Sequence, residues 1–190
     1  MKVEGIVSDS HYLAKQVTFE GLIKGLSIQN DSVLLEELLH VTGYNFFKPE
    51  ANYPFRDLVL CINFLRQKLF PELTDAQAYS KIARAQVEGY ISQTIFGRIT
   101  YAARKGGGGF KALELAIKNH SANFNFGKRT ITSTGENKAQ VTFENDPSNP
   151  VYVAAMLSAI LELQGVQDIK VTYRGVAKHH FIYDLGWLEK

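Results

Sequence analysis

The sequence predicts an α+β protein with an N-terminal helical layer followed by a C-terminal antiparallel β-β-α-β-β sheet unit. Two patterns lead to this prediction. Apolar residues recur three and four positions apart through most of residues 1–120, which is the spacing of amphipathic helices. Residues 121–190 instead contain two pairs of alternating segments separated by one apolar helix. A chain of 190 residues is long enough to bury a sizeable core, so we assign residues 1–190 to a single domain.

Two helical segments are expected in the first quarter of the chain. One or two short helices are predicted between residues 12 and 26, because Gly21 and Gly25 interrupt an otherwise helical apolar pattern. The next helix is expected to be capped by Asn30 or Asp31, whose side chains can accept a hydrogen bond from the first turn. Its inward face is predicted to contain Val33, Leu34, Leu38 and Val41.

The centre of the predicted helical layer is a long helical run that begins at Thr74. An aromatic loop and a helix that starts near Pro54 precede it, and the apolar stripe of that helix is Leu58, Ile62, Leu65 and Leu69. Thr74 and Gln77 have the spacing of a capping box, which marks the start of the run. Glycine inside a helix costs about 1 kcal/mol relative to alanine, so Gly89 and Gly97 are expected at close helix contacts or at a kink.

The helical run ends in four glycines at positions 106–109. A glycine-rich loop can bind phosphate at the start of a helix. Here no strand is predicted before the glycines, and no Gly-Lys-Ser or Gly-Lys-Thr follows them. We therefore interpret this segment as a flexible connector to another short helix.

The last third of the chain is predicted as two hairpins around one helix. The first hairpin turns at residues 135–137. The helix begins at Asn149 and ends at Gly165. The second hairpin is expected to turn between Gly175 and Lys178.

Composition excludes several classes of protein. Lys and Arg number 21 and Asp and Glu number 19, and the resulting net charge of +2 argues against a nucleic-acid-binding protein. The single cysteine, Cys61, cannot form an intrachain disulfide or a multi-cysteine zinc site. No segment approaches the roughly 18 apolar residues of a membrane span, and the N-terminus lacks the apolar core of a secretory signal. We expect a cytoplasmic protein with no nucleic-acid partner.

No catalytic or metal-binding signature in the sequence is complete. The Gly-x-Ser-x-Gly nucleophile elbow is absent. His179 and His180 are adjacent on a predicted strand, so their side chains should leave opposite faces and cannot bind one metal together. His11, His40 and His120 have no partner at metal-ligand spacing. They could bind a metal only with residues that the fold brings close, and the sequence does not predict which residues those are. The sequence therefore predicts a non-enzymatic protein with no cofactor and no metal site.

Two side chains have both a structural and a functional interpretation. Cys61 lies near the apolar stripe of its helix. It is either an inert buried thiol or a thiol that faces an apolar cavity, where it contacts or carries a fatty acyl group. Arg98 lies among apolar helical residues and needs a partner. That partner is either Glu88, Asp57 or a loop carbonyl, or else the anion of a ligand.

Several separated segments agree in order and spacing with one family pattern. They are Tyr53-Pro54 at the start of a helix, FPELTDAQAYSKIARAQVEGYISQTIFGR with its Gly97-Arg98 step, ANFNFG before the first hairpin, and PVYVAAMLSAILELQGV followed by strands that contain Asp184 and Trp187. From about Gly5 to Trp187 the chain resembles an uncharacterised bacterial family of small domains, often expanded into many paralogues.

That family is similar to a superfamily that includes vinyl-reductase-type ligand-binding domains, heme nitric-oxide-binding sensors and TRAPP trafficking subunits. The resemblance implies an α+β fold, commonly dimeric, with a small-molecule or lipid cavity between helices and sheet. This sequence departs from the superfamily patterns in two places. The second hairpin has Tyr173, His179 and His180 where the zinc-containing type has paired cysteines, and the Tyr-x-Ser-x-Arg heme-propionate signature is absent. Zinc and heme are therefore disfavoured.

The leading hypothesis is a sensory or scaffolding module that binds an apolar or amphipathic small molecule, such as a fatty acyl chain, or a protein partner. The side chains expected to line its cavity are Phe55, Leu58, Cys61, Ile62, Tyr90, Phe96, Tyr101, Tyr152 and Met156, with Arg98 as the polar anchor. The alternative is a homodimeric protein–protein interaction adaptor without a ligand, which predicts an exposed apolar helix face and a doubled mass.

Overall fold

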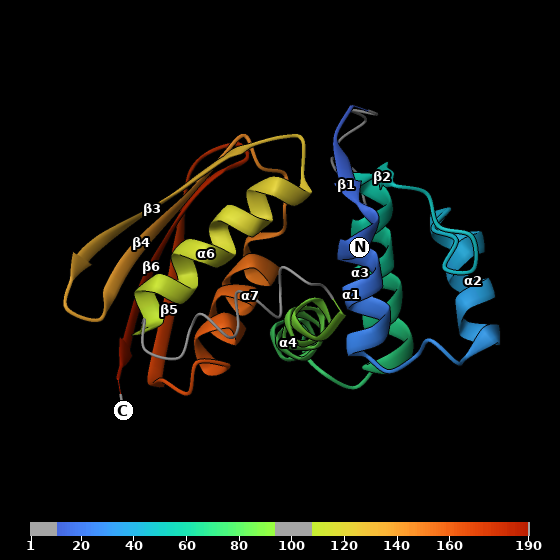
Figure 1. The fold of residues 1–190 in the computed structure, drawn as a ribbon, viewed down its shortest axis with the longest axis horizontal. Helices are drawn as coiled ribbons and strands as arrows, with labels where there is room; N and C mark the ends of the chain where they lie inside the picture. Colours follow the sequence, from blue (N-terminus) through green and yellow to red (C-terminus); the bar gives the residue numbers. More distant parts are fainter. Residues whose placement is uncertain (1–10, 94–107, 190) are drawn as a thin grey trace.

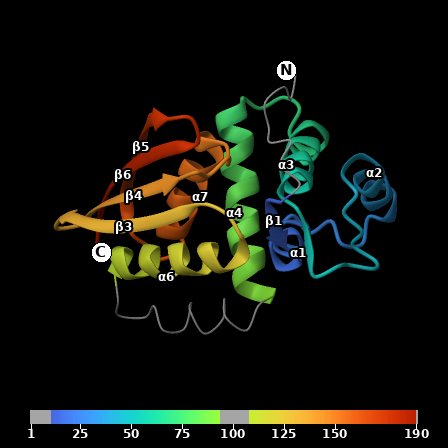
Figure 2. The same ribbon diagram turned by 90° about the horizontal axis from the view of Figure 1, so that it is seen from above.

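The computed structural model describes residues 11–93 and 108–189 and confirms the predicted α+β class. The elements are β1 (Leu13–Lys15), α1 (Gln16–Gly25), α2 (Ser32–Thr42), β2 (Asn52–Pro54), α3 (Phe55–Leu69), α4 (Asp75–Gln93), α6 (Gly108–Asn123), β3 (Lys128–Gly135), β4 (Lys138–Glu144), α7 (Pro150–Glu162), β5 (Gln167–Ala177) and β6 (His180–Leu188). Figure 1 shows the helices α1 to α4 beside a sheet, one face of which is covered by α6 and α7. In Figure 2, α4 stands between the two halves.

The helix α2 begins and ends as predicted but turns a different face inward. The Asp31 carboxylate accepts a backbone N–H of the first turn at 3.0 Å, and Gly43 ends the helix with a φ of 79°. The buried stripe is centred on Leu38. Val33 lies roughly 140° around the helix from Leu38, at 100° per residue. Val33 is 66% exposed and Val41 is 48% exposed, so the inward positions predicted for these two valines are wrong.

The helices α3 and α4 start where the sequence predicts. Pro54 immediately precedes α3, and most of the predicted apolar stripe of α3 is buried. The Thr74 N–H donates to Gln77 Oε1 at 3.1 Å, and the Gln77 N–H donates to Thr74 Oγ1 at 3.4 Å. This reciprocal pair is the predicted capping box, and it fixes the first turn of α4.

The helices α1 and α4 cross at glycines, which confirms the close helix contact predicted at Gly89. A Cβ atom on Gly89 would lie 2.0 Å from the Gly21 carbonyl oxygen, and one on Gly25 would lie 1.8 Å from the Ala85 carbonyl oxygen. A side chain cannot occupy either position, so this crossing requires glycine. The helix α4 continues through Gly89, and Gly97 lies outside the described residues.

The main sheet has the strand order β3-β4-β6-β5, and every neighbouring pair is antiparallel. The predicted β-β-α-β-β order is therefore confirmed. Alternate residues of the two central strands, β4 and β6, are buried. The strand β5 extends to Ala177, so the second hairpin turns at residues 178–179, later than the predicted turn that began at Gly175.

The glycine run is only partly a connector. The helix α6 begins at Gly108, so Gly108 and Gly109 belong to its first turn, while positions 106 and 107 lie outside the described residues. A Cβ atom on Gly109 would lie 2.6 Å from Trp187 Nε1. The Gly109 N–H donates to Glu189 Oε1 at 2.8 Å. Glycine at this position therefore allows α6 to pack closely against the end of the sheet.

The buried apolar residues form two clusters. The first is centred on the helical layer and includes Phe19 and Leu65. The second joins α6, α7 and the sheet and includes Val141 and Leu157. Met156 of α7 packs against both clusters. In the part of the chain that the structure describes, no helix has both the length and the apolarity needed to cross a membrane.

Candidate functional site

A cavity of about 460 Å³ lies where the helical layer meets α6, α7 and the sheet. Small-molecule pockets in proteins have volumes of roughly 300–1,000 Å³. Most of the wall is apolar and is formed by Phe55, Leu58, Val59 and Ile62 of α3, Val87, Tyr90 and Ile91 of α4, Ala116 and Ile117 of α6, and Val153, Met156, Leu157 and Ile160 of α7. Members of both core clusters contribute to this wall, so the cavity lies between them.

The structure brings six of the ten predicted cavity residues together in this wall. They are Phe55, Leu58, Ile62, Tyr90, Tyr152 and Met156. The predicted residues Phe96, Arg98 and Tyr101 lie outside the described residues. The six wall positions come from α3, α4 and α7.

Cys61 is buried but does not belong to the wall. It lies roughly 100° around α3 from its neighbour Ile62, which does face the cavity. Burial raises the pKa of its thiol to about 12, and the side chain of Thr42 opposes that change. The structure therefore corrects the cavity-facing interpretation of Cys61 and describes an enclosed, protonated thiol.

A polar cluster joins α1, α4 and α7 at the cavity wall. The Tyr152 hydroxyl donates to Gln86 Oε1 at 2.6 Å, and Gln86 Nε2 donates to the Thr18 carbonyl oxygen at 3.2 Å. Burial raises the pKa of Tyr152, and the neighbouring Tyr79 raises it further, so the Tyr152 hydroxyl remains a neutral donor. The Thr18 hydroxyl oxygen is buried without a hydrogen-bond partner. These bonds fix the Tyr152 ring in the wall.

Asp146, which lines the cavity, forms a buried ion pair with Arg129, and the two side chains are 1% and 0% exposed. The guanidinium of Arg129 also donates to the Phe126 carbonyl oxygen at 2.9 Å. It lies 5.3 Å from the ring centroids of Phe124 and Phe126 and 5.4 Å from that of Phe143. Burial lowers the pKa of Arg129, and the charge of Asp146 opposes that change. The two charges neutralise each other, so the pair adds no net charge to the wall.

His120, in the last turn of α6, contributes a neutral imidazole to the wall. Burial lowers its pKa well below the ordinary value, and the positive charge of Arg129 lowers it further. The ring centroid lies 4.5 Å from that of Phe124 and 5.6 Å from that of Phe143. Its Nδ1 atom is buried and has no hydrogen-bond partner. His120 therefore adds hydrogen-bonding capacity without charge.

The polar wall residues come mainly from three segment ends, and we call this set the polar rim. It consists of Asn119, His120 and Asn123 at the end of α6, Asp146, Ser148 and Asn149 before α7, and Lys178 and His179 in the β5–β6 turn. Figure 1 shows these segments together in the upper half of the molecule. The Asp146 N–H donates to the His179 carbonyl oxygen at 2.9 Å. His179 has a φ of 58° and lies in this turn, not on a strand as predicted.

Sequence reasoning did not identify Gln86, Arg129 or Asp146 as wall or cavity-lining groups. Arg129 and Ile131 are two positions apart on an alternating strand, so alternation alone would have placed both on the inward face. No local signal marks Gln86, because its burial depends on α1 and α7 packing against α4. Among the described residues, no group of three or more His, Cys, Asp and Glu side chains is arranged to hold a metal ion.

A family model described as "Protein of unknown function (DUF2378)" matches residues 13–188 of the chain. The curated proteins contain no match. The match agrees with the predicted resemblance to a family of unknown function. The predicted likeness to the vinyl-reductase and TRAPP groups remains a prediction.

Solved structures with a similar fold include H-NOX proteins. One from S. oneidensis in the Fe(II)NO ligation state is 12% identical, with a TM-score of 0.65 over 92% of this chain and 99% of that chain. An Fe(II) unliganded H-NOX protein from K. algicida is 5% identical, with a TM-score of 0.64 over 93% of this chain and 97% of that chain. A structure from work on heme redox potential and protein-induced porphyrin distortion is 11% identical, with a TM-score of 0.67 over 92% of this chain and 99% of that chain. At these identities the likeness establishes the fold alone.

Proposed function

The chain belongs to the DUF2378 family of unknown function, and we propose that it is a sensory or scaffolding module that binds an apolar or amphipathic small molecule. The cavity between the helical layer and the sheet half is the observation that carries this proposal. The fold shared with the H-NOX proteins supports it, because one of those proteins is described in the Fe(II)NO ligation state.

The composition of the wall supports an apolar or amphipathic ligand. Four helices contribute aliphatic or aromatic side chains, while the polar groups are gathered mainly at the rim and in the Tyr152–Gln86 pair. Binding sites for small organic molecules have this composition, in which apolar area provides affinity and a few polar groups fix orientation. Burying apolar ligand surface contributes about 25 cal/mol per Å².

Heme does not fit the described wall. A histidine that ligates a metal almost always donates its other ring N–H to a carboxylate, a backbone carbonyl or water. The buried Nδ1 atom of His120 has no such partner, so nothing orients its Nε2 atom as a metal ligand, and the nearby Arg129 is already bound to Asp146. The other imidazole of the wall, His179, lies in the β5–β6 turn. We therefore propose a ligand other than heme.

Native mass spectrometry of freshly purified protein tests the proposal directly. We expect a species heavier than the 21.3 kDa chain that loses its extra mass when the protein is denatured. Adding the extracted molecule back should raise the thermal midpoint. At a concentration of one hundred times Kd, the stabilisation is about 2.7 kcal/mol, which corresponds to roughly 5–10 °C for a chain of this size.

A pair of variants separates cavity binding from surface binding. Ala116→Phe places a ring in the wall of the cavity, whereas Lys118→Phe places the same ring on the exposed side of α6. We expect Ala116→Phe to lose the thermal shift and Lys118→Phe to keep it. If neither variant changes the shift, or if the purified chain carries no molecule and none raises its midpoint, the cavity is not a ligand site.

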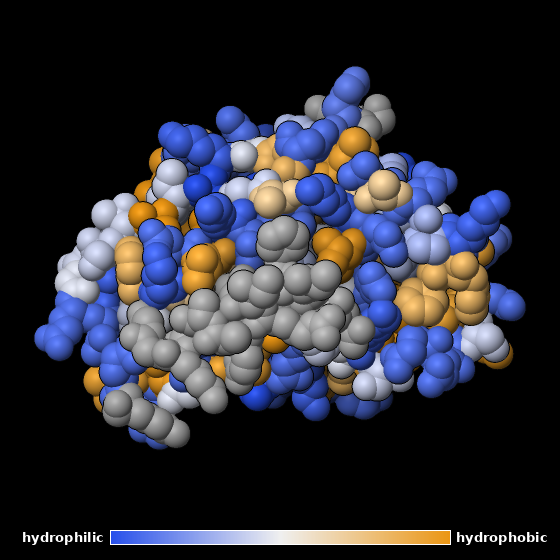
Figure 3. All heavy atoms as spheres, viewed as in Figure 1, coloured by the Kyte–Doolittle hydropathy of each residue, from blue (hydrophilic) through white to orange (hydrophobic). Residues whose placement is uncertain are grey.

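A homodimeric interaction adaptor is the second candidate, and exposed apolar side chains favour it. Val33 and Val41 on α2 and Phe47 after it are 66%, 48% and 59% exposed. Figure 3 shows apolar side chains over α2 on the right of the molecule. Light scattering should then give twice the chain mass, and Val33→Asp should halve that value. Val176→Asp on β5, at a site that is 55% exposed, is the matched control.

We propose a non-enzymatic role because the described wall offers no assembled catalytic group. No serine, threonine or cysteine side chain of that wall is hydrogen-bonded to a histidine or a carboxylate in the described part of the chain. Activated nucleophiles usually need such a base within hydrogen-bonding distance. Turnover of a bound ligand, measured by mass spectrometry over hours, would contradict this assignment.

A further inference from the structure

We propose that the cavity takes an amphipathic carboxylic acid, with its carboxylate at the polar rim beside Lys178 and its apolar body between α3, α4 and α7. This inference rests on the ligand-binding function proposed above and names the class of ligand. It follows from how polarity and charge are distributed over the wall.

Apart from a few uncharged polar side chains, among them Asn63 and the Tyr152–Gln86 pair, the wall separates into an apolar inner part and the polar rim. The inner part includes Val87 and Ile91 of α4 and Leu157 and Ile160 of α7. The charged side chains of the described wall, Asp146 and Lys178, both belong to the rim. Because an unpaired charge in the inner part would lose its hydration without compensation, a ligand that fills the cavity needs an apolar body with any charge at one end.

The ionised groups of the rim leave one positive charge unbalanced. Asp146 is neutralised by Arg129 and also accepts the Ser148 N–H at 2.9 Å. Lys178 lines the cavity, its side chain is exposed, and no ion pair involves it in the described part of the chain. A cation at the mouth of a mostly apolar cavity attracts an anion, and it disfavours a cationic head group.

The remaining rim side chains can hydrogen-bond to a carboxylate without opposing its charge. Asn123 and Ser148 are uncharged, and burial beside Arg129 keeps His120 neutral. A carboxylate therefore meets one ammonium group and several neutral polar groups at this end of the cavity.

Three probes with one tail and different head groups test this inference on the full chain. Dodecanoate, dodecanol and dodecyltrimethylammonium are titrated separately by isothermal calorimetry, below the concentrations at which they form micelles. An apolar cavity alone favours the alcohol, because an ionised carboxylate is far more costly to remove from water than a hydroxyl group. We expect dodecanoate to bind at least as tightly as dodecanol and dodecyltrimethylammonium to bind most weakly.

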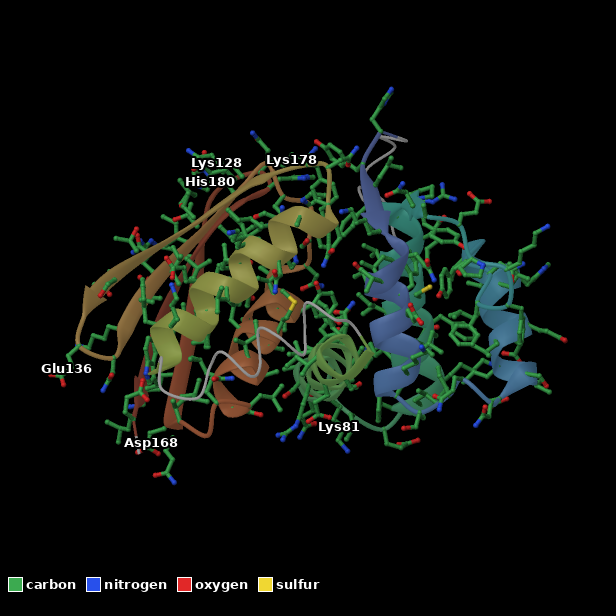
Figure 4. All side chains as sticks on the ribbon, viewed as in Figure 1. Lys81, Lys128, Glu136, Asp168, Lys178 and His180 are labelled. Carbon is green, nitrogen blue, oxygen red and sulfur yellow. The ribbon has the colours of Figure 1, made fainter. Side chains whose placement is uncertain are left out.

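Two lysine variants then locate the carboxylate. Figure 4 shows Lys128 and Lys178 at the same end of the molecule. Lys178 lines the cavity, whereas Lys128 does not and lies 3.6 Å from a Glu144 carboxylate oxygen. We expect Lys178→Met to weaken dodecanoate binding about fivefold, the upper range for an exposed ion pair. Dodecanol binding should be unchanged, and Lys128→Met should leave both affinities unchanged.

The outcomes separate this inference from the function it rests on. If dodecanol binds more tightly than dodecanoate, or if Lys178→Met leaves dodecanoate binding unchanged, the carboxylate assignment is overturned while the ligand-binding function stands. Equal weakening by both lysine variants also overturns it, because the effect would then come from net charge. If no probe binds and no molecule co-purifies, both proposals fail. Unchanged circular dichroism of Lys178→Met confirms that the variant is folded.

Discussion

Replacing Gly25 by alanine should destabilise the protein by separating α1 from α4. The new Cβ atom would lie 1.8 Å from the Ala85 carbonyl oxygen and 2.4 Å from its carbonyl carbon. Ordinary contact begins at 3.4 Å, so the two backbones must move apart by roughly 1.6 Å. Overpacking costs about 1–3 kcal/mol. Backbone atoms cannot relieve a clash by changing rotamer, so the cost here should be about 3 kcal/mol or more. Alanine recovers about 1 kcal/mol of helix propensity, which leaves a net loss of about 2 kcal/mol.

Thermal unfolding followed by circular dichroism measures this loss. A loss of about 2 kcal/mol lowers the midpoint by roughly 4–8 °C in a chain of this size. Gly186→Ala is the matched control, because a Cβ atom on Gly186 in β6 has no neighbour within 4 Å. Its midpoint should change little. Equal midpoints for Gly25→Ala and Gly186→Ala would refute the claim that the helix crossing requires glycine.

Three further outcomes are expected from buried ionisable groups. Asp146→Asn should cost about 3–5 kcal/mol in denaturant unfolding, since it leaves Arg129 buried without a counter-charge; a cost below 1 kcal/mol would contradict this. The Cys61 thiol, with its pKa raised to about 12, should react with a thiol reagent at pH 8 much more slowly in the native than in the unfolded chain, and equal rates would argue against its enclosure. The pKa of His120 is lowered in the folded state, so the unfolded chain binds a proton that the folded chain does not as pH falls below about 6.5. Stability should therefore fall there by up to about 1.4 kcal/mol per pH unit, and His120→Gln should reduce that slope.

The sequence was sufficient for several helix starts because those starts depend on neighbouring residues. The Asp31 cap, the Thr74–Gln77 box and the Asn149 cap each join atoms within three residues of one another. Inward faces were harder to predict. Val33 is as apolar as the leucines that follow it, and only the position of α3 decides that it faces outward.

The candidate site shows the same difference between features set by local sequence and features set by tertiary packing. Six wall residues could be predicted because the family resemblance implies a cavity between helices and sheet, and these residues belong to aromatic-rich or apolar predicted helices. The polar members depend on tertiary contacts. Gln86 and Tyr152 are 66 positions apart, and their hydrogen bond exists only because α4 packs on α7. No local pattern specifies that pairing, so it could not be predicted from one sequence.

The position of the cavity between the two core clusters explains how a ligand can affect the whole fold. The ion pair of Arg84 on α4 with Glu162 on α7 joins these helices at 2.9 Å, but its side chains are 53% and 41% exposed. Such a pair contributes at most about 1 kcal/mol. A molecule in the cavity would contact α3 and α4 on one side and α6 and α7 on the other. If the proposed function holds, the stability of the junction rises with ligand concentration, and sensing further requires a second state that binds the ligand less tightly.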